Sequence, residues 1–337
     1  RNLGLGLSIF AMGLFKKAVL ADGVAGYANV AFANVDNGVT LDFFAAWAGA
    51  LAYTFQLYFD FSGYSDMAIG LARMFGIILP LNFYSPYKSV NISEFWRRWH
   101  MTLSRFLRDY LYIALGGNRA GNFNRYRNLF LTMVIGGIWH GAGWNFLIWG
   151  ALHGSYLIIF HAWRYLFPAL HALQNAWALM IGWGVTFVGV VVGWVFFRAV
   201  TFDGAITMLK GMFGSYGVSI PQGIWTRLGD TVTGFLSQLG MTESSAGSSA
   251  FVQVWVWNIL LLVVVLTMPN TQDIFSRVAG SLSKLSYDRR DTFWPGINLV
   301  SGIGWKANTR WALISAILFV AGVLTLSQVS EFLYFQF

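Results

Sequence analysis

The 337-residue sequence contains no cysteine, and only 11% of its residues are Asp, Glu, Lys or Arg. Without cysteine the chain can form neither a disulfide scaffold nor a zinc site with cysteine ligands. Soluble globular proteins carry about 25% charged residues, whereas 56% of this chain is hydrophobic and 18% is aromatic. This composition excludes a disordered chain, a coiled coil and an ordinary cytosolic enzyme, and it indicates a polytopic membrane protein.

Signatures of the common soluble enzymes are absent as well. The sequence has no Walker A loop, no GxSxG nucleophile elbow, no HExxH zinc motif and no dinucleotide-binding fingerprint. The net charge of +8 does not require a nucleic acid partner, because basic loops that face anionic lipid account for it. We therefore expect membrane lipid among the partners and no nucleic acid.

Several uncharged stretches are long enough to cross a bilayer as helices, which takes about 20 residues. They are too long for the roughly ten-residue alternating strands of an outer-membrane barrel. The helix-length runs are 2–15, 43–59 (continuing past Asp60), 128–160 (a hairpin or a broken helix), 176–197, 250–268 and 311–330. We expect an all-α polytopic bundle of roughly six to nine spanning or re-entrant helices, in which residues 1–337 form a single transmembrane domain.

Charged residues outside these runs predict the orientation of the chain. Region 269–310 has six basic and three acidic residues, whereas region 201–249 has two basic and three acidic ones. The positive-inside rule therefore predicts that 269–310 faces the cytoplasm. It also predicts that the loop 214–249 and the C-terminal residues 331–337 lie on the non-cytoplasmic side.

The charge that the chain does have is concentrated in residues 88–127, which contain eight basic and two acidic residues. Asn91 followed by Glu94 is a helix-start pattern. Apolar residues then recur at helical spacing, at Phe95, Trp99, Leu103, Phe106 and Tyr110, with Arg98, Arg105 and Asp109 on another face. The pattern predicts a basic amphipathic helix in the membrane interface, ended by two glycines at 116–117. An in-plane anchor without chemistry explains this pattern equally well.

Two histidines stand out near these segments. His140 lies near the middle of the uncharged run 128–160 and is bracketed by four glycines, at positions 136, 137, 141 and 143. An ionisable group within a membrane segment is costly and often functional, although tight helix packing around a structural histidine is the alternative. His153 would lie about 20 Å from His140 on one straight helix, so we expect no shared metal site. His100 sits beside the apolar stripe and is either functional or simply interfacial.

Asp60 and Asp66 lie towards the end of an apolar run, in the sequence LYFDFSGYSDMAIG. Two carboxylates in this position are consistent with a proton relay. They are also consistent with structural pairing to Arg73 or to the basic helix, and we favour the structural pairing.

Five stretches in chain order carry a resemblance to a known family. They are FDFSGYSDMAIGLARMFG, NFYSPYKSVNISEFWRRWHMTLSRFLRDYLYI, GGIWHGAGWNFLIWGALHG, WVFFRA and MPNTQ. Together they resemble the membrane-bound O-acyltransferase (MBOAT) superfamily, and most of all its bacterial branch of alginate O-acetyltransferase-like polysaccharide acetylation proteins. Members of this family usually have further helices before the segment that starts here. Because the chain begins with Arg1, we expect it to be the C-terminal portion of a longer protein.

The resemblance implies a fold, a reaction and its catalytic residues. The fold is a helix bundle with a tunnel through the bilayer, and the reaction is transfer of an acetyl group from a cytoplasmic thioester to a hydroxyl. The family's invariant histidine matches His140 in Trp139-His140-Gly141, and its second polar position matches His100. A histidine is suited to take the proton of the attacking hydroxyl, so we expect His140 to be the general base. His100 would orient the acceptor, relay the proton or polarise the carbonyl.

The same resemblance implies the substrates and partners. We expect acetyl-CoA or another acetyl thioester as donor substrate, with no bound cofactor. The residues expected to bind substrate or donor are Arg97, Arg98, Trp96, Trp139 and Asn145, and Arg105 and Arg108 could add attraction for donor phosphates. The acceptor would be an exopolysaccharide such as alginate, modified by a periplasmic acetylase partner beyond the bacterial inner membrane. The alternatives are a D-alanyl or other acyl transferase of the same superfamily, or a non-enzymatic polytopic transporter.

Overall fold

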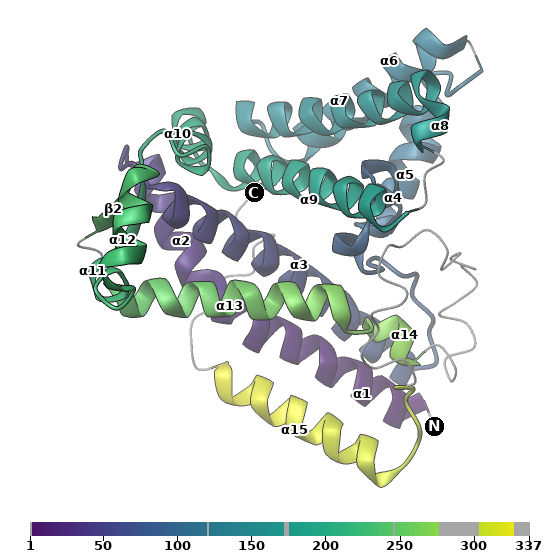
Figure 1. Cartoon of the computed structure of the whole chain (residues 1–337). Coiled ribbons are helices and arrows are strands. Elements are labelled where there is room, and N and C mark those ends of the chain that lie inside the picture. Colours follow the sequence, from purple (N-terminus) through teal and green to yellow (C-terminus); the bar gives the residue numbers. More distant parts are fainter. Residues whose placement is uncertain (1, 120, 172–174, 245–246, 276–302, 327–337) are drawn as a thin grey trace.

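The computed structural model describes residues 2–119, 121–171, 175–244, 247–275 and 303–326, and it is almost entirely helical (Figure 1). The N-terminal half contains α1 (Asn2–Phe15), η1 (Lys16–Ala21), α2 (Asp22–Asp36), α3 (Phe43–Met74), η2 (Pro86–Lys88), α4 (Ile92–Arg98), α5 (Met101–Phe106), η3 (Leu107–Tyr112), α6 (Gly121–His140) and α7 (Trp144–Leu166). The remainder contains α8 (Pro168–His171), α9 (Ala176–Arg198), α10 (Phe202–Met212), β1 (Val218–Pro221), α11 (Gln222–Trp225), α12 (Gly229–Gln238), β2 (Met241–Ser244), α13 (Ser248–Thr267), α14 (Thr271–Phe275) and α15 (Thr309–Thr325).

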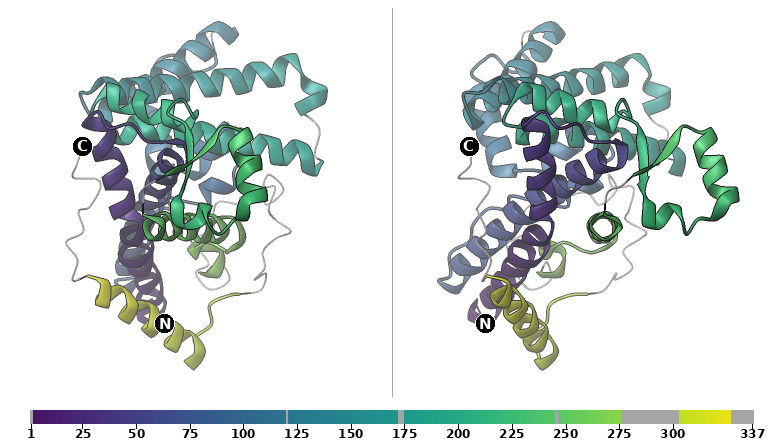
Figure 2. Two further views of the ribbon diagram at one scale, coloured as in Figure 1. Left: turned by 60° about the vertical axis from the view of Figure 1, so that its left-hand side comes forward. Right: turned by 90° about the vertical axis from the view of Figure 1, so that its left-hand side faces the viewer.

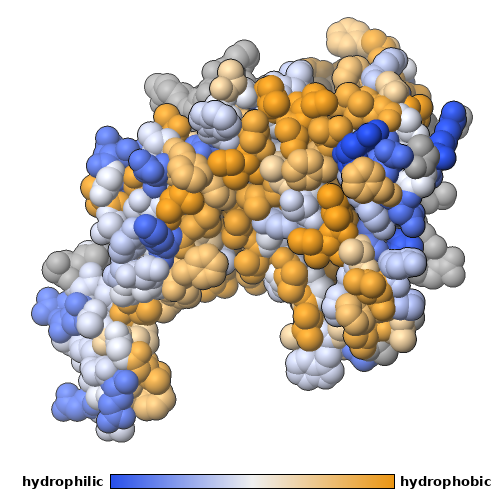
Figure 3. Space-filling view, turned by 90° about the horizontal axis from the view of Figure 1, so that it is seen from above, coloured by the Kyte–Doolittle hydropathy of each residue, from blue (hydrophilic) through white to orange (hydrophobic). Residues whose placement is uncertain are grey.

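The predicted apolar runs coincide with long helices. Four stretches of the described chain are long and apolar enough to cross a membrane: Asn2–Asp36, Trp144–Leu166, Ala176–Arg198 and Ser248–Phe275. The run at 43–59 continues through Asp60 as expected, because α3 is a single helix of 32 residues. Seen from above, apolar side chains cover a broad central band and hydrophilic ones gather towards the sides (Figure 3). The fold class is therefore confirmed as an all-α polytopic membrane bundle.

The helices form two groups that meet at α3. In Figure 1, α6, α7 and α9 lie in the upper part of the molecule, and α1, α13 and α15 lie below them. α1 packs along α3, and α15 lies beside α1 in all views (Figure 2). One large core of buried apolar side chains runs from α2 and α3 through α4 to α7 and α9. A second, smaller core surrounds the start of α1.

The basic segment is not one continuous amphipathic helix, and that prediction is wrong. α4 ends at Arg98, Trp99 is extended, and α5 starts only after His100, which has a left-handed backbone with φ of 41°. The predicted start is confirmed, because the Asn91 side chain accepts a hydrogen bond from the Glu94 amide at 2.8 Å. The apolar stripe divides at the break. Its first two members, Phe95 and Trp99, are buried in the large core, whereas Phe106 and Tyr110 are 57% and 72% exposed.

The segment 214–249 contains the strands of the described chain. β1 and β2 form a parallel two-stranded sheet, with α11 and α12 between them in sequence. The Ser219 hydroxyl donates to the Asp42 carboxylate, which also caps α3 by accepting from the Ala45 amide. The sheet is thereby attached to the first turn of α3. The side of the membrane on which 214–249 lies stays a prediction, and residues 331–337 lie outside the described chain.

Two buried ion pairs join the first helical segment to α3. Lys16 binds Asp66 at 2.6 Å and Lys17 binds Asp60 at 2.9 Å, and both carboxylates are only 2% exposed. The structural pairing that we favoured for these aspartates is confirmed. The partners, however, are lysines of the π-helical turn η1 rather than Arg73 or the basic helix.

Replacing Asp66 should destabilise the protein strongly. Asp66→Ala leaves the Lys16 ammonium without its carboxylate, and removal of one partner of a buried pair costs about 3–5 kcal/mol. We expect a clear fall in the midpoint of thermal unfolding of the full-length protein in detergent. Asp109→Ala is the matched control, because Asp109 pairs with Arg108 on the surface and its loss should change the midpoint little. Equal midpoints for Asp66→Ala and the wild type would contradict a structural role for the pair.

Candidate active site

His140 lies at the tip of a helical hairpin. It is the last residue of α6, and α7 begins at Trp144, so the run 128–160 is a hairpin rather than one broken helix. The Asn145 side chain, at the start of α7, donates to the carbonyl oxygen of Ala199 at 2.7 Å and attaches the tip to the end of α9. The half-buried imidazole contacts the rings of Trp149 and Phe197, at centroid distances of 5.3 and 5.1 Å.

Glycines bring the two arms of this hairpin into close contact. A Cβ at Gly137 would collide with the carbonyl oxygen of Phe146, and a Cβ at Gly150 would lie 2.5 Å from the carbonyl oxygen of Met133. Small residues allow such backbone approach between helices. The tight helix packing expected of these glycines is therefore confirmed. They pack α6 against α7, and Gly141 to Gly143 open the turn that ends α6 at His140.

His100 lies in the break between α4 and α5. Its left-handed backbone is uncommon for a residue with a side chain and marks local strain. Two backbone hydrogen bonds flank the break: the Tyr84 amide donates to Arg98 at 3.0 Å, and the Met101 amide donates to Asn82 at 2.9 Å. The ring packs edge-on against Phe61, with centroids 4.8 Å apart.

An aromatic wall connects the two histidines. We use this name for Phe83, Trp99, Trp194 and Trp149, whose successive ring centroids are 5.1, 4.9 and 6.1 Å apart. His100 stacks on the first ring at 6.4 Å, and His140 contacts the last at 5.3 Å. Burial lowers the pKa of His100 to about 4, and the charge of the nearby His140 also lowers it. The wall therefore holds two imidazoles within electrostatic reach of each other.

The structure separates the two candidate arginines. Arg97 is exposed on α4. Arg98 is 1% exposed and binds Glu94 at 2.7 Å, and its guanidinium also donates to the Tyr84 carbonyl oxygen at 3.3 Å. A donor phosphate at Arg98 would have to displace Glu94, so the geometry favours a structural role for this arginine.

The other predicted residues lie at different depths around His140. Trp96 is half-buried and packs edge-on against Trp149. Trp139 is 58% exposed, although its ring contacts His140. Asn145 is buried, and its side-chain oxygen has no hydrogen-bond partner among the described residues. Trp139 and Asn145 therefore lie at the hairpin tip, whereas Trp96 packs against Trp149 and His153 farther along α7.

The sequence analysis did not single out Asn82, and it considered His153 only as a possible partner of His140 in a metal site. Asn82 bonds the ring of His100, and its only signal in the sequence was its place just before the basic segment, which offered no chemistry by itself. His153 is fully buried against Trp96 and Trp149, and within the described chain neither of its ring nitrogens is hydrogen-bonded. His153 and His140 lie on different arms of the hairpin and both contact Trp149. No group of three or more metal-ligating side chains occurs in the part of the chain that the structure describes.

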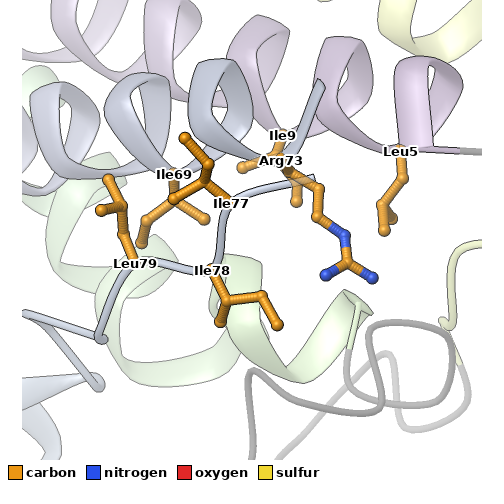
Figure 4. Close-up of a pocket in the computed structure, with 7 residues that line it drawn as sticks. All are labelled: Leu5, Ile9, Ile69, Arg73, Ile77, Ile78 and Leu79. Atoms are coloured by element: carbon orange, nitrogen blue, oxygen red, sulfur yellow. The ribbon is translucent and has the colours of Figure 1, made fainter. Parts of the chain in front are cut away.

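A small cavity lies away from the histidines. It lies between α1 and the end of α3 (Figure 4). Its lining consists of Leu5, Ile9, Ile69, Arg73, Ile77, Ile78 and Leu79. None of these side chains belongs to the aromatic wall, and the cavity is not part of the candidate active site.

Comparison with known proteins shows a consistent set of relatives. The profile of the MBOAT, membrane-bound O-acyltransferase family matches residues 1–199, which include both histidines. A probable alginate O-acetylase AlgI from Azotobacter vinelandii is 41% identical over 343 residues, covering 98% of this chain and 62% of that protein. A peptidoglycan O-acetyltransferase from Helicobacter pylori is 52% identical over 220 residues, covering 65% of this chain and 41% of that protein.

The name of a more distant relative indicates transfer of a different group. A teichoic acid D-alanyltransferase from Streptococcus thermophilus is 33% identical over 162 residues, covering 43% of this chain and 39% of that protein. The chain spans about three fifths of the length of the AlgI relative that it matches almost throughout.

Gly137→Ala should disturb the position of His140. The added methyl group would overlap the Phe146 carbonyl oxygen, and overpacking of this kind costs about 1–3 kcal/mol. We expect a lower unfolding midpoint together with reduced activity of the full-length protein. Gly184→Ala is the matched control, because a Cβ there has no neighbour within 4 Å and α9 should tolerate it. If both variants behave alike, the close contact between α6 and α7 does not position the site.

Proposed function

Because the chain belongs to the membrane-bound O-acyltransferase family, we propose that its protein moves an acetyl group from a thioester donor across or into the membrane, for the O-acetylation of an exopolysaccharide. The observation that carries this proposal is the pair of histidines at opposite ends of one aromatic wall, His140 at the tip of the α6–α7 hairpin and His100 in the break between α4 and α5. A hydroxyl is a poor nucleophile at neutral pH, and a nearby imidazole compensates for this by general base catalysis.

The proposed reaction centres on His140. Its imidazole accepts the proton of the acceptor hydroxyl while the hydroxyl oxygen attacks the carbonyl carbon of the acetyl thioester. When the tetrahedral intermediate collapses, the carbon–sulfur bond breaks, and the thiolate leaves and takes up the proton from the imidazolium. His100 assists at the acceptor side. Within the aromatic wall little water competes with these hydrogen bonds, which strengthens them.

The donor is proposed to be acetyl-CoA or another cytoplasmic acetyl thioester. Exposed Arg97, with Arg105 and Arg108 farther along, supplies positive charge that would attract donor phosphates. Trp139 and Asn145 at the hairpin tip, with Trp96 against Trp149, are proposed to shape the space for the acyl group. Arg98 is assigned to holding α4 through Glu94.

The protein is proposed to lie in the bacterial inner membrane with 214–249 on the periplasmic side. There a periplasmic acetylase partner would receive the acetyl group and pass it to the polymer. Alginate is the first acceptor to test, because relatives named as probable alginate O-acetylases cover 98% of the chain. Peptidoglycan is the second, because a peptidoglycan O-acetyltransferase is 52% identical over 65% of the chain. Mass spectrometry of the acetylated polymer separates the two.

His140→Ala in the full-length protein should abolish acetyl transfer. General base catalysis contributes about 10²–10⁴-fold, so we expect at least the lower figure in lost rate. Proteoliposomes supplied with labelled acetyl thioester measure transfer to an acceptor or to a partner protein. Transport of the label without covalent transfer would favour a transporter instead. His161→Ala is the matched control, because this half-buried histidine lies near Arg125, on a different part of α7. Normal transfer by well-inserted His140→Ala would refute the assignment.

His100→Gln tests the second histidine separately. Glutamine keeps hydrogen-bonding groups but cannot exchange a proton as imidazole does. We expect both His100→Gln and His100→Asn to insert normally into the membrane and to transfer acetyl groups more slowly than the wild type. Full activity of either variant would mean that the imidazole has no duty in proton transfer.

A further inference from the structure

The side chain of Asn82 meets His100 and the start of α5 at one oxygen atom. Its Oδ1 lies 3.0 Å from the His100 Nδ1, accepts the Thr102 amide at 3.3 Å and accepts the Thr102 hydroxyl at 2.9 Å. Its Nδ2 donates to the Ser65 hydroxyl at 3.4 Å. Its backbone carbonyl also accepts the Met101 amide. Asn82 thus bonds both residues that follow the strained His100: Met101 through its main chain and Thr102 through its side chain.

These contacts determine the orientation of the Asn82 side-chain amide, that is, the positions of its oxygen and nitrogen. A backbone N–H can only donate a hydrogen bond, so the atom that faces the Thr102 amide is the amide oxygen and not the amide nitrogen. The same oxygen faces the His100 Nδ1. An amide oxygen cannot donate to a ring nitrogen, and the contact is favourable only when Nδ1 carries the hydrogen. The Thr102 hydroxyl also lies 3.4 Å from Nδ1, but it donates its hydrogen to the Asn82 oxygen over the shorter distance of 2.9 Å. In neutral His100 the lone pair therefore lies on Nε2.

The backbone of His100 supports the same geometry. A left-handed residue with a side chain is strained and persists only where its surroundings hold it. The Met101 and Thr102 amides, both bonded to Asn82, are among the first amides of α5, which has no earlier turn to accept them. Asn82 thereby caps α5 and holds the turn that points the imidazole of His100 towards Phe61 and Phe83.

We propose that Asn82 is a positioning residue that fixes His100 in the tautomer with its proton on Nδ1, so that Nε2 accepts a hydrogen bond from the acceptor hydroxyl. This inference rests on the proposed function for the identity of that hydroxyl. It decides among the roles open to His100. Nε2 with a lone pair can orient the acceptor or relay its proton, but it cannot donate to and polarise the acyl carbonyl.

The tautomer can be measured without any assay of transfer. Solid-state NMR of the full-length protein labelled with ¹⁵N-histidine in membranes distinguishes protonated from unprotonated ring nitrogens, and His100→Gln assigns the His100 signals by difference. We expect a protonated Nδ1 and an unprotonated Nε2 at neutral pH in the wild type. Asn82→Asp should preserve this pattern because a carboxylate accepts the same two N–H groups. Asn82→Leu should lose it. A wild-type His100 with its proton on Nε2 overturns the proposal whatever the activity.

Kinetics then test whether the tautomer matters. Asn82→Leu should lower kcat by about 10²-fold, the lower end of the general acid–base contribution, with a much smaller change in KM. Asn82→Asp should recover part of that loss. Ser65→Ala is the matched control and should transfer normally, because it removes only the contact to Nδ2. If Asn82→Leu does not fold, the wild-type and Asn82→Asp spectra still decide the tautomer.

The failure of this inference and the failure of the proposed function give different results. If His100→Gln is fully active and the wild-type spectrum is as expected, His100 has no role in catalysis. That result overturns the proposal that Nε2 of His100 accepts a hydrogen bond from the acceptor hydroxyl, although the tautomer itself is confirmed. Loss of activity in His100→Gln with wild-type kcat in Asn82→Leu leaves the proposed function standing. That second result overturns the role of Asn82.

Discussion

The pairing of Lys16 and Lys17 with Asp66 and Asp60 is the constraint on which the bundle depends. A charge inside a membrane protein must be paired within the protein, because lipid offers it no partner. The π-helical turn η1 presents two consecutive lysines to α3. The two ion pairs fix both the rotation of the first helical segment about its own axis and its position along the axis of α3. Asp66 also accepts the Thr271 hydroxyl and the Gln272 amide at 2.7 and 3.0 Å, which brings α14 to the same point.

The candidate active site is built on the helix that these pairs hold. From α3, Phe61 packs edge-on against His100, and the Thr54 carbonyl oxygen accepts the Tyr87 hydroxyl at 2.7 Å. The Tyr87 hydroxyl in turn accepts the indole N–H of Trp194, a member of the aromatic wall, at 3.2 Å. The wall is therefore connected to α3 by hydrogen bonds as well as by packing. A shift of α3 would therefore change the distance between the two histidines.

Sequence periodicity predicted what depends on neighbouring residues and missed what depends on distant ones. The long helices and the Asn91 cap follow from local composition, which left a hairpin and a broken helix open at 128–160, and the resemblance singled out His100 and His140. The break at His100 could not be predicted, because residues 92–112 have a helical pattern and the break is held by Asn82, eighteen positions away in sequence. Asp66 was given Arg73 as a candidate partner because it is near in sequence, whereas Lys16, fifty residues away, binds it.

The same scarcity of charge explains why imidazoles suit the chemistry proposed here. Each buried carboxylate of α3 is already bonded to a lysine and serves to hold α3 against η1. An imidazole is neutral at rest, so it can lie against aromatic rings without a counter-charge and still accept a proton. His140 is placed by the backbone packing of a glycine-lined hairpin, and His100 by hydrogen bonds that hold a strained turn. Separate elements therefore hold the two imidazoles that share one aromatic wall.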